Sequence, residues 1–197
     1  FAAFNNRSIL SLAGLGILYS FVIYGANQIV NPYLQKVFNI SITSAGFLTT
    51  LWGIGVIIGG LLCGWLSKNL GQQRSVQIAV FLSLASILAL AVLFSPQLAW
   101  VMVVVFGIAF GFYETIYFAL CMQCTDPRIA ASMYSILMAV ANIGTGLSMA
   151  VVGGLVDSIG FSSTFIFLAA SNLVAIPLIA ILFSTKGYPK TNPVMEE

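Results

Sequence analysis

The sequence predicts an all-α integral membrane protein of six transmembrane helices, and three observations carry that prediction. Of the 197 residues, 60% are hydrophobic and 6% are charged, and the mean hydropathy is +1.05. This composition leaves too little polar surface to coat a water-soluble globule. Six apolar stretches are each long enough for a helix to cross a bilayer, which takes roughly 20 residues. Membrane strands would be about half as long and would alternate in polarity, so the stretches suit helices.

The six expected spans follow one another with short breaks, and we treat residues 1–197 as a single transmembrane domain. They are residues 8–30, 43–66, 76–94, 98–120, 130–156 and 163–183. Turn or charge signals mark the breaks at Asn31-Pro32, 67–73, Ser95-Pro96-Gln97, 125–128 and 157–160. We expect Pro177 to kink the last helix and residues 184–197 to form a cytoplasmic tail.

The basic residues are divided unevenly between the two ends of such an arrangement. Six spans return both termini to one side, and Lys36 then lies alone on the other side. By the positive-inside rule we expect both termini in the cytoplasm, in a plasma or inner membrane. The net charge of +2 and the scattered basic residues indicate no nucleic-acid partner. The basic residues on the expected cytoplasmic side are Arg7, Lys68, Arg74, Arg128, Lys186 and Lys190.

Glycines recur at a four-residue spacing in the second and fourth expected spans. The pairs are Gly55 and Gly59, Gly60 and Gly64, and Gly107 and Gly111. Small residues at this spacing let two helix backbones approach closely, where dispersion replaces the hydrophobic drive that lipid does not supply. We therefore expect tight helix packing along these two spans.

An internal repeat emerges when the segments after the second and fifth spans are aligned. Gly64-Trp-Leu-Ser-Lys-Asn-Leu-Gly71 resembles Gly153-Gly-Leu-Val-Asp-Ser-Ile-Gly160, with a glycine, a leucine, a branched apolar residue and a second glycine in register. An offset of three spans reverses the orientation in the membrane. The pattern therefore predicts an inverted repeat of three plus three helices, as in many secondary transporters.

Residues 32–41, then Gly46-Phe-Leu and residues 60–74, resemble the start of a half-domain of the major facilitator superfamily. That family has a cytoplasmic signature loop with spaced glycines, an acidic-then-basic pair and a following arginine. Three residues of this chain match the signature: Gly64, Gly71 and Arg74. Two depart from it, because Lys68 and Asn69 replace the acidic-then-basic pair. Because the acid supports a contact that stabilises one access state in the family, we do not expect that gate here.

The resemblance implies one six-helix half of a twelve-helix transporter, most similar to the C-terminal half. It implies movement of a small solute by alternating access, with coupling to protons as one option and an N-terminal half or a second copy as partner. The chain opens on Phe1 and not Met, which indicates a processed product or a fragment. Whether it is a fragment of a twelve-helix protein or a true half stays open. The alternative is a non-transporting assembly or sensing subunit on the same scaffold. A fainter similarity, to the peptide, acetyl-coenzyme A and muropeptide branch, rests on Gln123-Cys-Thr-Asp-Pro-Arg128, Ser132-Met-Tyr134 and Asn142-Ile-Gly144.

Two polar stripes mark the candidate substrate and proton pathway. On the first span the stripe occupies positions i, i+3, i+4 and i+7, which share one helix face. By the repeat the first and fourth spans are equivalents, and by the resemblance they line the cavity. The alternative is that the polar groups bond neighbouring helices as glue. The stripes comprise Tyr24, Asn27, Gln28 and Asn31 on the first span and Tyr113, Glu114 and Tyr117 on the fourth.

Glu114 is the only acidic side chain deep inside an expected span. A carboxylate at that depth costs a few kcal/mol and persists where it faces a bundle interior or a water-filled path. Three roles remain open: exchange of a proton, pairing with a cationic substrate or a base of another half, and a permanently protonated structural acid. Asn142 and Tyr134 are weaker candidates on the fifth span, and Trp52 fits either core or cavity.

The sequence indicates no enzyme, no cofactor and no metal site. It has no histidine, and Cys121 and Cys124 have no second pair to complete a zinc site. No phosphate-binding glycine loop followed by Lys and Ser or Thr is present, so ATP-driven transport has no support. The expected partners are therefore the lipid bilayer and a small-molecule substrate.

Overall fold

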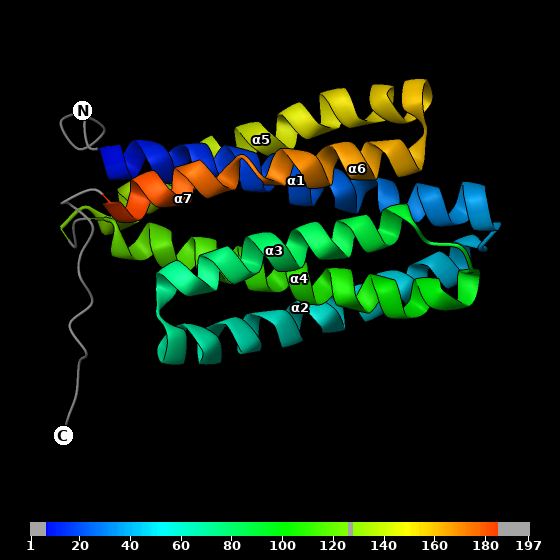
Figure 1. The fold of residues 1–197 in the computed structure, drawn as a ribbon, viewed down its shortest axis with the longest axis horizontal. Helices are drawn as coiled ribbons and strands as arrows, with labels where there is room; N and C mark the ends of the chain where they lie inside the picture. The colour runs from blue at the N-terminus through cyan, green and yellow to red at the C-terminus, as the bar shows by residue number, and fades with distance from the viewer. Residues whose placement is uncertain (1–6, 126–127, 185–197) are drawn as a thin grey trace.

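The computed structural model describes residues 7–125 and 128–184, and these residues are helical almost throughout, with no strand among them. Figure 1 shows the helices side by side in one bundle, with the start of α1 and the end of α7 at the same end of it. Six helices are long and apolar enough to cross a membrane when α6 and α7 count as one span, which confirms the predicted fold class. The bounds are α1 (Arg7–Phe38), α2 (Ile42–Leu70), α3 (Gln72–Ala91), α4 (Pro96–Gln123), α5 (Ala130–Ile159), α6 (Phe161–Asn172) and α7 (Ala175–Ser184).

The predicted break at Asn31-Pro32 is wrong, because α1 continues through Pro32 to Phe38. Proline removes one backbone hydrogen bond, but neighbouring helices make this tolerable in a membrane helix. The chain turns instead at Asn39, whose φ of 53° lies in the left-handed region that Asn accepts better than most residues. Ser41 then caps α2 by accepting a hydrogen bond from the Ser44 N–H at 3.2 Å.

The residues predicted as a signature loop are mostly helical. Gly64 and Lys68 lie within α2, and Arg74 lies in the first turn of α3. The turn itself consists of Gly71, whose φ of 80° glycine adopts without a steric penalty. The predicted break over 67–73 is therefore too long, because Gly71 alone connects α2 to α3.

Gly160 connects α5 to α6 in the same way, with the same φ of 80°. In each case a hydroxyl one turn later bonds the glycine carbonyl: Ser75 Oγ donates to Gly71 O at 2.9 Å, and Thr164 Oγ1 donates to Gly160 O at 2.7 Å. Ser83 and Asn172, which are 89 residues apart like the two glycines, contact each other directly. These matched geometries are consistent with the inverted three-plus-three repeat.

The helices pair in a matching pattern: α2 packs mainly on α4, and α5 packs mainly on α1. In both pairs glycine brings the backbones together. A Cβ atom at Gly144 of α5 would collide with the Ile17 carbonyl oxygen of α1, and the α2–α4 crossing uses four such positions. The four are Gly55, Gly59, Gly107 and Gly111, which confirms two of the predicted pairs.

The third predicted pair, Gly60 and Gly64, does not form a helix contact of this kind. A Cβ at Gly60 would meet the Thr115 hydroxyl at 3.1 Å, and one at Gly64 would have no atom within 4 Å. The spacing alone does not identify the contact face, because α2 carries glycine on more than one of its faces.

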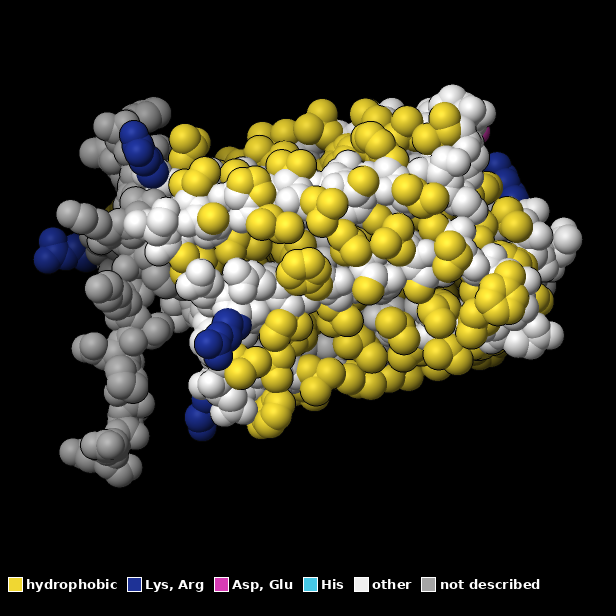
Figure 2. All heavy atoms as spheres, in the orientation of Figure 1, with side chains coloured by type: hydrophobic (Ala, Val, Ile, Leu, Met, Phe, Trp, Pro, Cys, Tyr) yellow, Lys and Arg dark blue, Asp and Glu magenta, His cyan; other side chains and the backbone are white. Residues whose placement is uncertain are grey.

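Helices α3, α6 and α7 form a second layer over α1 and α4 (Figure 1). Figure 2 shows the face over them as mostly hydrophobic along the bundle, with Lys and Arg side chains at its ends. The described basic residues follow the predicted division, with Lys36 at one end and Arg7, Lys68, Arg74 and Arg128 at the other. Lys186, Lys190 and the rest of the expected tail lie outside the described residues.

Candidate transport site

A hydrogen bond joins the two predicted polar stripes. The Tyr24 hydroxyl on α1 donates to Oε1 of Glu114 on α4 at 2.8 Å, and both side chains are half-buried. Within the described residues Tyr24 is the one hydrogen-bond donor to Glu114, and no basic side chain forms an ion pair with it. A carboxyl oxygen accepts in this way in both its ionised and its neutral form, so the contact suits each of the three roles left open by the sequence.

Two other amides of α1 bond to different helices. Gln28 Nε2 donates to Ser148 Oγ of α5, and Asn31 Nδ2 donates to Thr49 Oγ1 of α2, each at 3.1 Å. Both hydroxyls then donate to backbone carbonyls of their own helices. Both contacts fit the polar glue that was the alternative to a cavity, although Asn31 and Thr49 also line the pocket described next.

Asn27 differs from them, because within the described residues its amide makes no side-chain hydrogen bond. It lines a pocket of about 70 Å³ between α1, α2 and α4. That volume holds roughly two water molecules. The remaining lining residues are Val30, Asn31, Thr49, Trp52 and Val103.

Trp52, which fitted either core or cavity in the sequence, belongs to this pocket. Its Nε1 is buried and has no hydrogen-bond partner among the described residues. An indole nitrogen can only donate, and a buried donor without a partner is costly, so this position favours an acceptor from a ligand or water. The pocket thus presents one indole donor and the amide of Asn27.

The pocket and the Tyr24–Glu114 pair are connected by an aromatic wall. The Phe110 ring lies 5.1 Å from that of Tyr24 and 5.0 Å from that of Trp52, edge to face in both cases. Asn31 is seven residues from Tyr24, so the polar groups extend over about 10 Å along α1. Polar and aromatic groups therefore form one continuous strip along the membrane-spanning part of α1.

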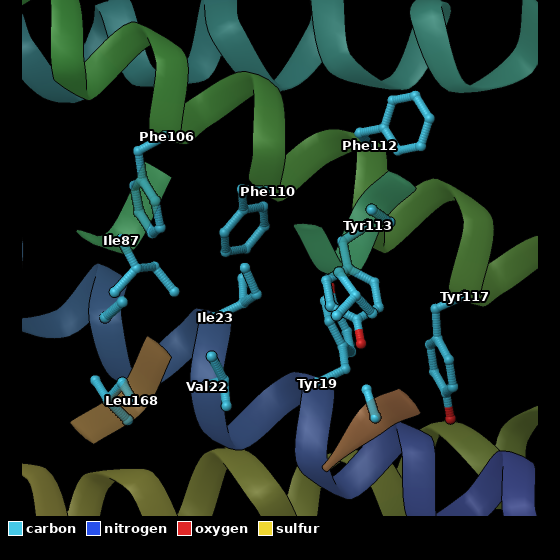
Figure 3. Packing of buried hydrophobic residues seen from close by; sticks show 14 of the residues in the cluster. Tyr19, Val22, Ile23, Ile87, Phe106, Phe110, Phe112, Tyr113, Tyr117 and Leu168 are labelled. Carbon is cyan, nitrogen blue, oxygen red and sulfur yellow. The ribbon is translucent and has the colours of Figure 1, made fainter. Parts of the chain in front are cut away.

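Tyr113 and Tyr117 are fully buried and do not form an open stripe beside Glu114, which corrects the sequence reading. Figure 3 shows them pointing from α4 toward α1, where Tyr19 meets them. The Tyr19 ring lies 4.8 Å from Tyr113 and 5.3 Å from Tyr117. Gly16 leaves the space that the Tyr117 hydroxyl occupies. These tyrosines pack the α1–α4 crossing from inside and support the Tyr24–Glu114 pair.

Sequence reasoning missed Tyr19, Thr49, Ser148 and Phe110. Tyr19 is five residues from Tyr24 and falls off the i, i+3, i+4, i+7 face that defined the stripe. The others lie on other helices or carry no charge, so no local pattern marks them. Only the neighbour relations of the helices bring them to the site.

The two weaker candidates on α5 lie in different surroundings. Asn142 is exposed, whereas Tyr134 is half-buried and packs edge-on against Phe118, with ring centroids 6.2 Å apart. Gly64, Lys68 and Arg74 are exposed at one end of the bundle. In the described part of the chain no group of three or more His, Cys, Asp or Glu residues could hold a metal ion.

Comparison with known proteins identifies the family. The family model described as Major Facilitator Superfamily matches residues 12–197. The drug efflux pump JefA of Mycobacterium tuberculosis is 28% identical over 179 residues, and the match covers 90% of this chain and 34% of that protein. A transporter of Rickettsia bellii named AmpG 1 is 24% identical, over 87% of this chain and 42% of that protein.

Solved structures agree with this fold. A peptide transporter, POT, in complex with alafosfalin has a TM-score of 0.79 at 18% identity, over 92% of this chain and 39% of that one. The inward-open xylose transporter XylE of Escherichia coli has a TM-score of 0.70 at 20% identity, over 91% and 48%. The chain thus spans between a third and a half of the length of these proteins.

Proposed function

The chain belongs to the Major Facilitator Superfamily, and we propose that it is one six-helix half, the C-terminal one, of a secondary transporter that moves a small solute by alternating access. Its multi-pass membrane fold and its transporter relatives support this proposal. The same relatives favour transport over an enzymatic role. The cargos named for them include drugs, peptides and xylose, so a peptide-type branch remains one proposal among several.

The hydrogen bond between Tyr24 and Glu114 is the observation that carries the proposal. It places a half-buried carboxyl group between the two helices that the repeat makes equivalent. A carboxyl at membrane depth is costly unless it faces water, a partner group or a bundle interior. The strip that continues through Phe110 to the pocket beside Asn27 supplies such surroundings.

This half is incomplete as a transport path, because Asn142 is exposed and Glu114, Tyr24 and Asn27 are only half-buried. Uncovered amide and carboxyl groups facing lipid would each cost several kcal/mol. We therefore propose that an N-terminal half, or a second copy of this chain, covers this side and supplies the other wall of the cavity.

We propose that Glu114 carries either the coupling proton or the charge that attracts a cationic solute. Its second oxygen has no donor within the described residues, which leaves it available to a proton, a cation or a base from the other half. We also propose that both termini are cytoplasmic, from the basic residues clustered at the end of the bundle where α1 begins and α7 ends.

Cysteine accessibility distinguishes transport from the alternative of a non-transporting assembly or sensing subunit, without requiring a known substrate. Asn27→Cys is made in a background where Cys63, Cys121 and Cys124 are replaced by serine, with the chain assembled with its other half in sealed vesicles. A charged, membrane-impermeant thiol reagent is applied from one side and then from the other. Alternating access predicts labelling from both sides. Ile166→Cys, half-exposed on the lipid-facing α6, is the control and is expected to stay unlabelled.

Labelling of Asn27→Cys from neither side would contradict a solvent path at this position. Labelling from one side only, under every condition, would favour the non-transporting subunit.

A further inference from the structure

A second pocket lies in the second layer of the bundle, between α3 and α7. Its volume is about 230 Å³, and Gln77 is the one polar residue among those that line it. Phe81 and Ile176 are about half-exposed, so the pocket opens on the outer surface of the second layer. That face is apolar over most of its length (Figure 2). The remaining lining residues are Val80 and Ile179.

The break between α6 and α7 explains why the pocket exists. Pro177 has no N–H to bond the Leu173 carbonyl, and backbone bonds of three-residue spacing replace the helical pattern around 173 and 174. The kink predicted at Pro177 is confirmed as this interruption between Asn172 and Ala175. Figure 1 shows α7 alongside α3, with the end of α7 and the start of α3 at the same end of the bundle. We call the pocket that these two helices line the α3–α7 groove.

Asn172 lies beside the groove, where Val80 lines it. Its Nδ2 donates to the Val80 carbonyl at 3.0 Å and to Ser83 Oγ at 2.6 Å, and the Asn172 side chain is fully buried. This contact holds α6 against α3 just before the helix break. The lining of the groove ends next to it, at Phe81 and Ile176.

The position of the groove along α3 places it within one leaflet. Its lining begins five residues after Gln72, at Gln77, and ends nine residues after it, at Phe81, which is about 8 to 14 Å from the start of the helix. The hydrocarbon core of a bilayer is about 30 Å thick, so one leaflet contributes about half of it. An apolar groove at this depth is within reach of the chain of a lipid whose headgroup lies where α3 begins.

The charges at the end of the bundle where α3 begins favour an anionic headgroup. Arg74 is exposed and lies one helical turn from Gln77, on the same side of α3. Lys68 and Arg128 lie at the same end of the bundle. Of the two described acids, Glu114 is inside the bundle and Asp157 is near the last turn of α5, at the opposite end. Basic side chains between helices at a membrane surface attract anionic lipid headgroups.

We propose that the α3–α7 groove binds the acyl chain of an anionic phospholipid from the leaflet in which α3 begins, with Arg74 at its phosphate and Gln77 below it. This site is separate from the Tyr24–Glu114 pair and does not depend on the transported solute. A lipid held here would fill the space that the α6–α7 break opens in the second layer.

Native mass spectrometry of the full chain tests the proposal, with phosphatidylglycerol and phosphatidylcholine as the two probes. The wild-type chain is expected to retain one phosphatidylglycerol in preference to phosphatidylcholine. Arg74→Gln is expected to reduce that preference about fivefold, the loss expected for one basic contact near a membrane surface. Ile176→Trp fills the groove and is expected to abolish retention of both lipids.

Two matched controls separate the groove from general effects. Lys68→Gln removes a charge at the same end of the bundle, and Ile166→Trp adds the same bulk at an equally exposed position of α6. Both are expected to behave as wild type. Phe81→Ala removes one side of the groove without adding bulk and is expected to weaken retention of both lipids. If Ile176→Trp does not fold, Phe81→Ala is the variant that tests binding in the groove. Wild-type retention in Arg74→Gln, or equal losses in Lys68→Gln, would overturn the proposal.

Discussion

Substituting alanine for glycine at the α2–α4 crossing measures how closely this protein depends on backbone contact between helices. At Gly59 the new Cβ would collide with the Ile108 carbonyl oxygen, well inside the 3.4 Å at which ordinary contact begins. The added atom belongs to a rigid backbone position and meets another backbone, so relief requires the helices to separate. Overpacking of this kind costs about 1–3 kcal/mol.

Gly64→Ala is the matched control. Gly64 lies on the same helix as Gly59, but its new Cβ would have no neighbouring atom within 4 Å. Both substitutions gain the same helix propensity, about 1 kcal/mol, so the difference between the two variants isolates the contact. For a chain of this size about 1 kcal/mol corresponds to 2–4 °C. We expect Gly59→Ala to unfold roughly 3–9 °C below Gly64→Ala in detergent, measured by differential scanning fluorimetry.

Gly144→Ala on α5 should show the same loss, since its Cβ would meet the Ile17 carbonyl oxygen at the crossing that corresponds to the first one. Equal unfolding temperatures for Gly59→Ala and Gly64→Ala would refute the reasoning, because the close approach would then contribute nothing measurable. A loss in Gly59→Ala without one in Gly144→Ala would restrict the argument to the α2–α4 pair.

Three further predictions concern transport and topology. If Glu114 carries a proton, Glu114→Gln should abolish pH-driven uptake but spare solute exchange. If Glu114 holds a cationic solute, the same change should weaken solute binding by about 1–3 kcal/mol. Unchanged uptake, pH dependence and affinity at a normal protein level would leave Glu114 a structural role. Labels at Ser95 and Asp157 should be reached from outside and a label at Asn69 from the cytoplasm, and reaction of Ser95 and Asn69 from one side would contradict six spans. Crosslinking in lipid should capture the chain with an N-terminal half or with itself, because the polar side is otherwise uncovered; monomers alone would exclude this.

Much of the candidate site could be predicted because its polar groups are rare in an apolar chain. Glu114, Tyr24 and Asn27 were recognisable from their type and depth alone, and the structure brings the first two into contact. The behaviour of Gln28 could not be predicted, because its partner, Ser148, is 120 residues away. Helix periodicity identifies a face but does not identify the helix that covers it.

The sequence by itself determined the membrane class, the number of spanning helices and the stretches in which the chain turns after the second and fifth spans, which contain Gly71 and Gly160. These features follow from local energies: apolar transfer over about 20 residues, and the conformational freedom of single residues. The tertiary structure decided which glycines touch a backbone and which polar side chains line a pocket. It also decided that α1 passes Pro32 without ending, since neighbouring helices compensate for the lost hydrogen bond. These outcomes depend on which helices lie side by side, and that relation joins residues too distant in the chain for any local pattern to report.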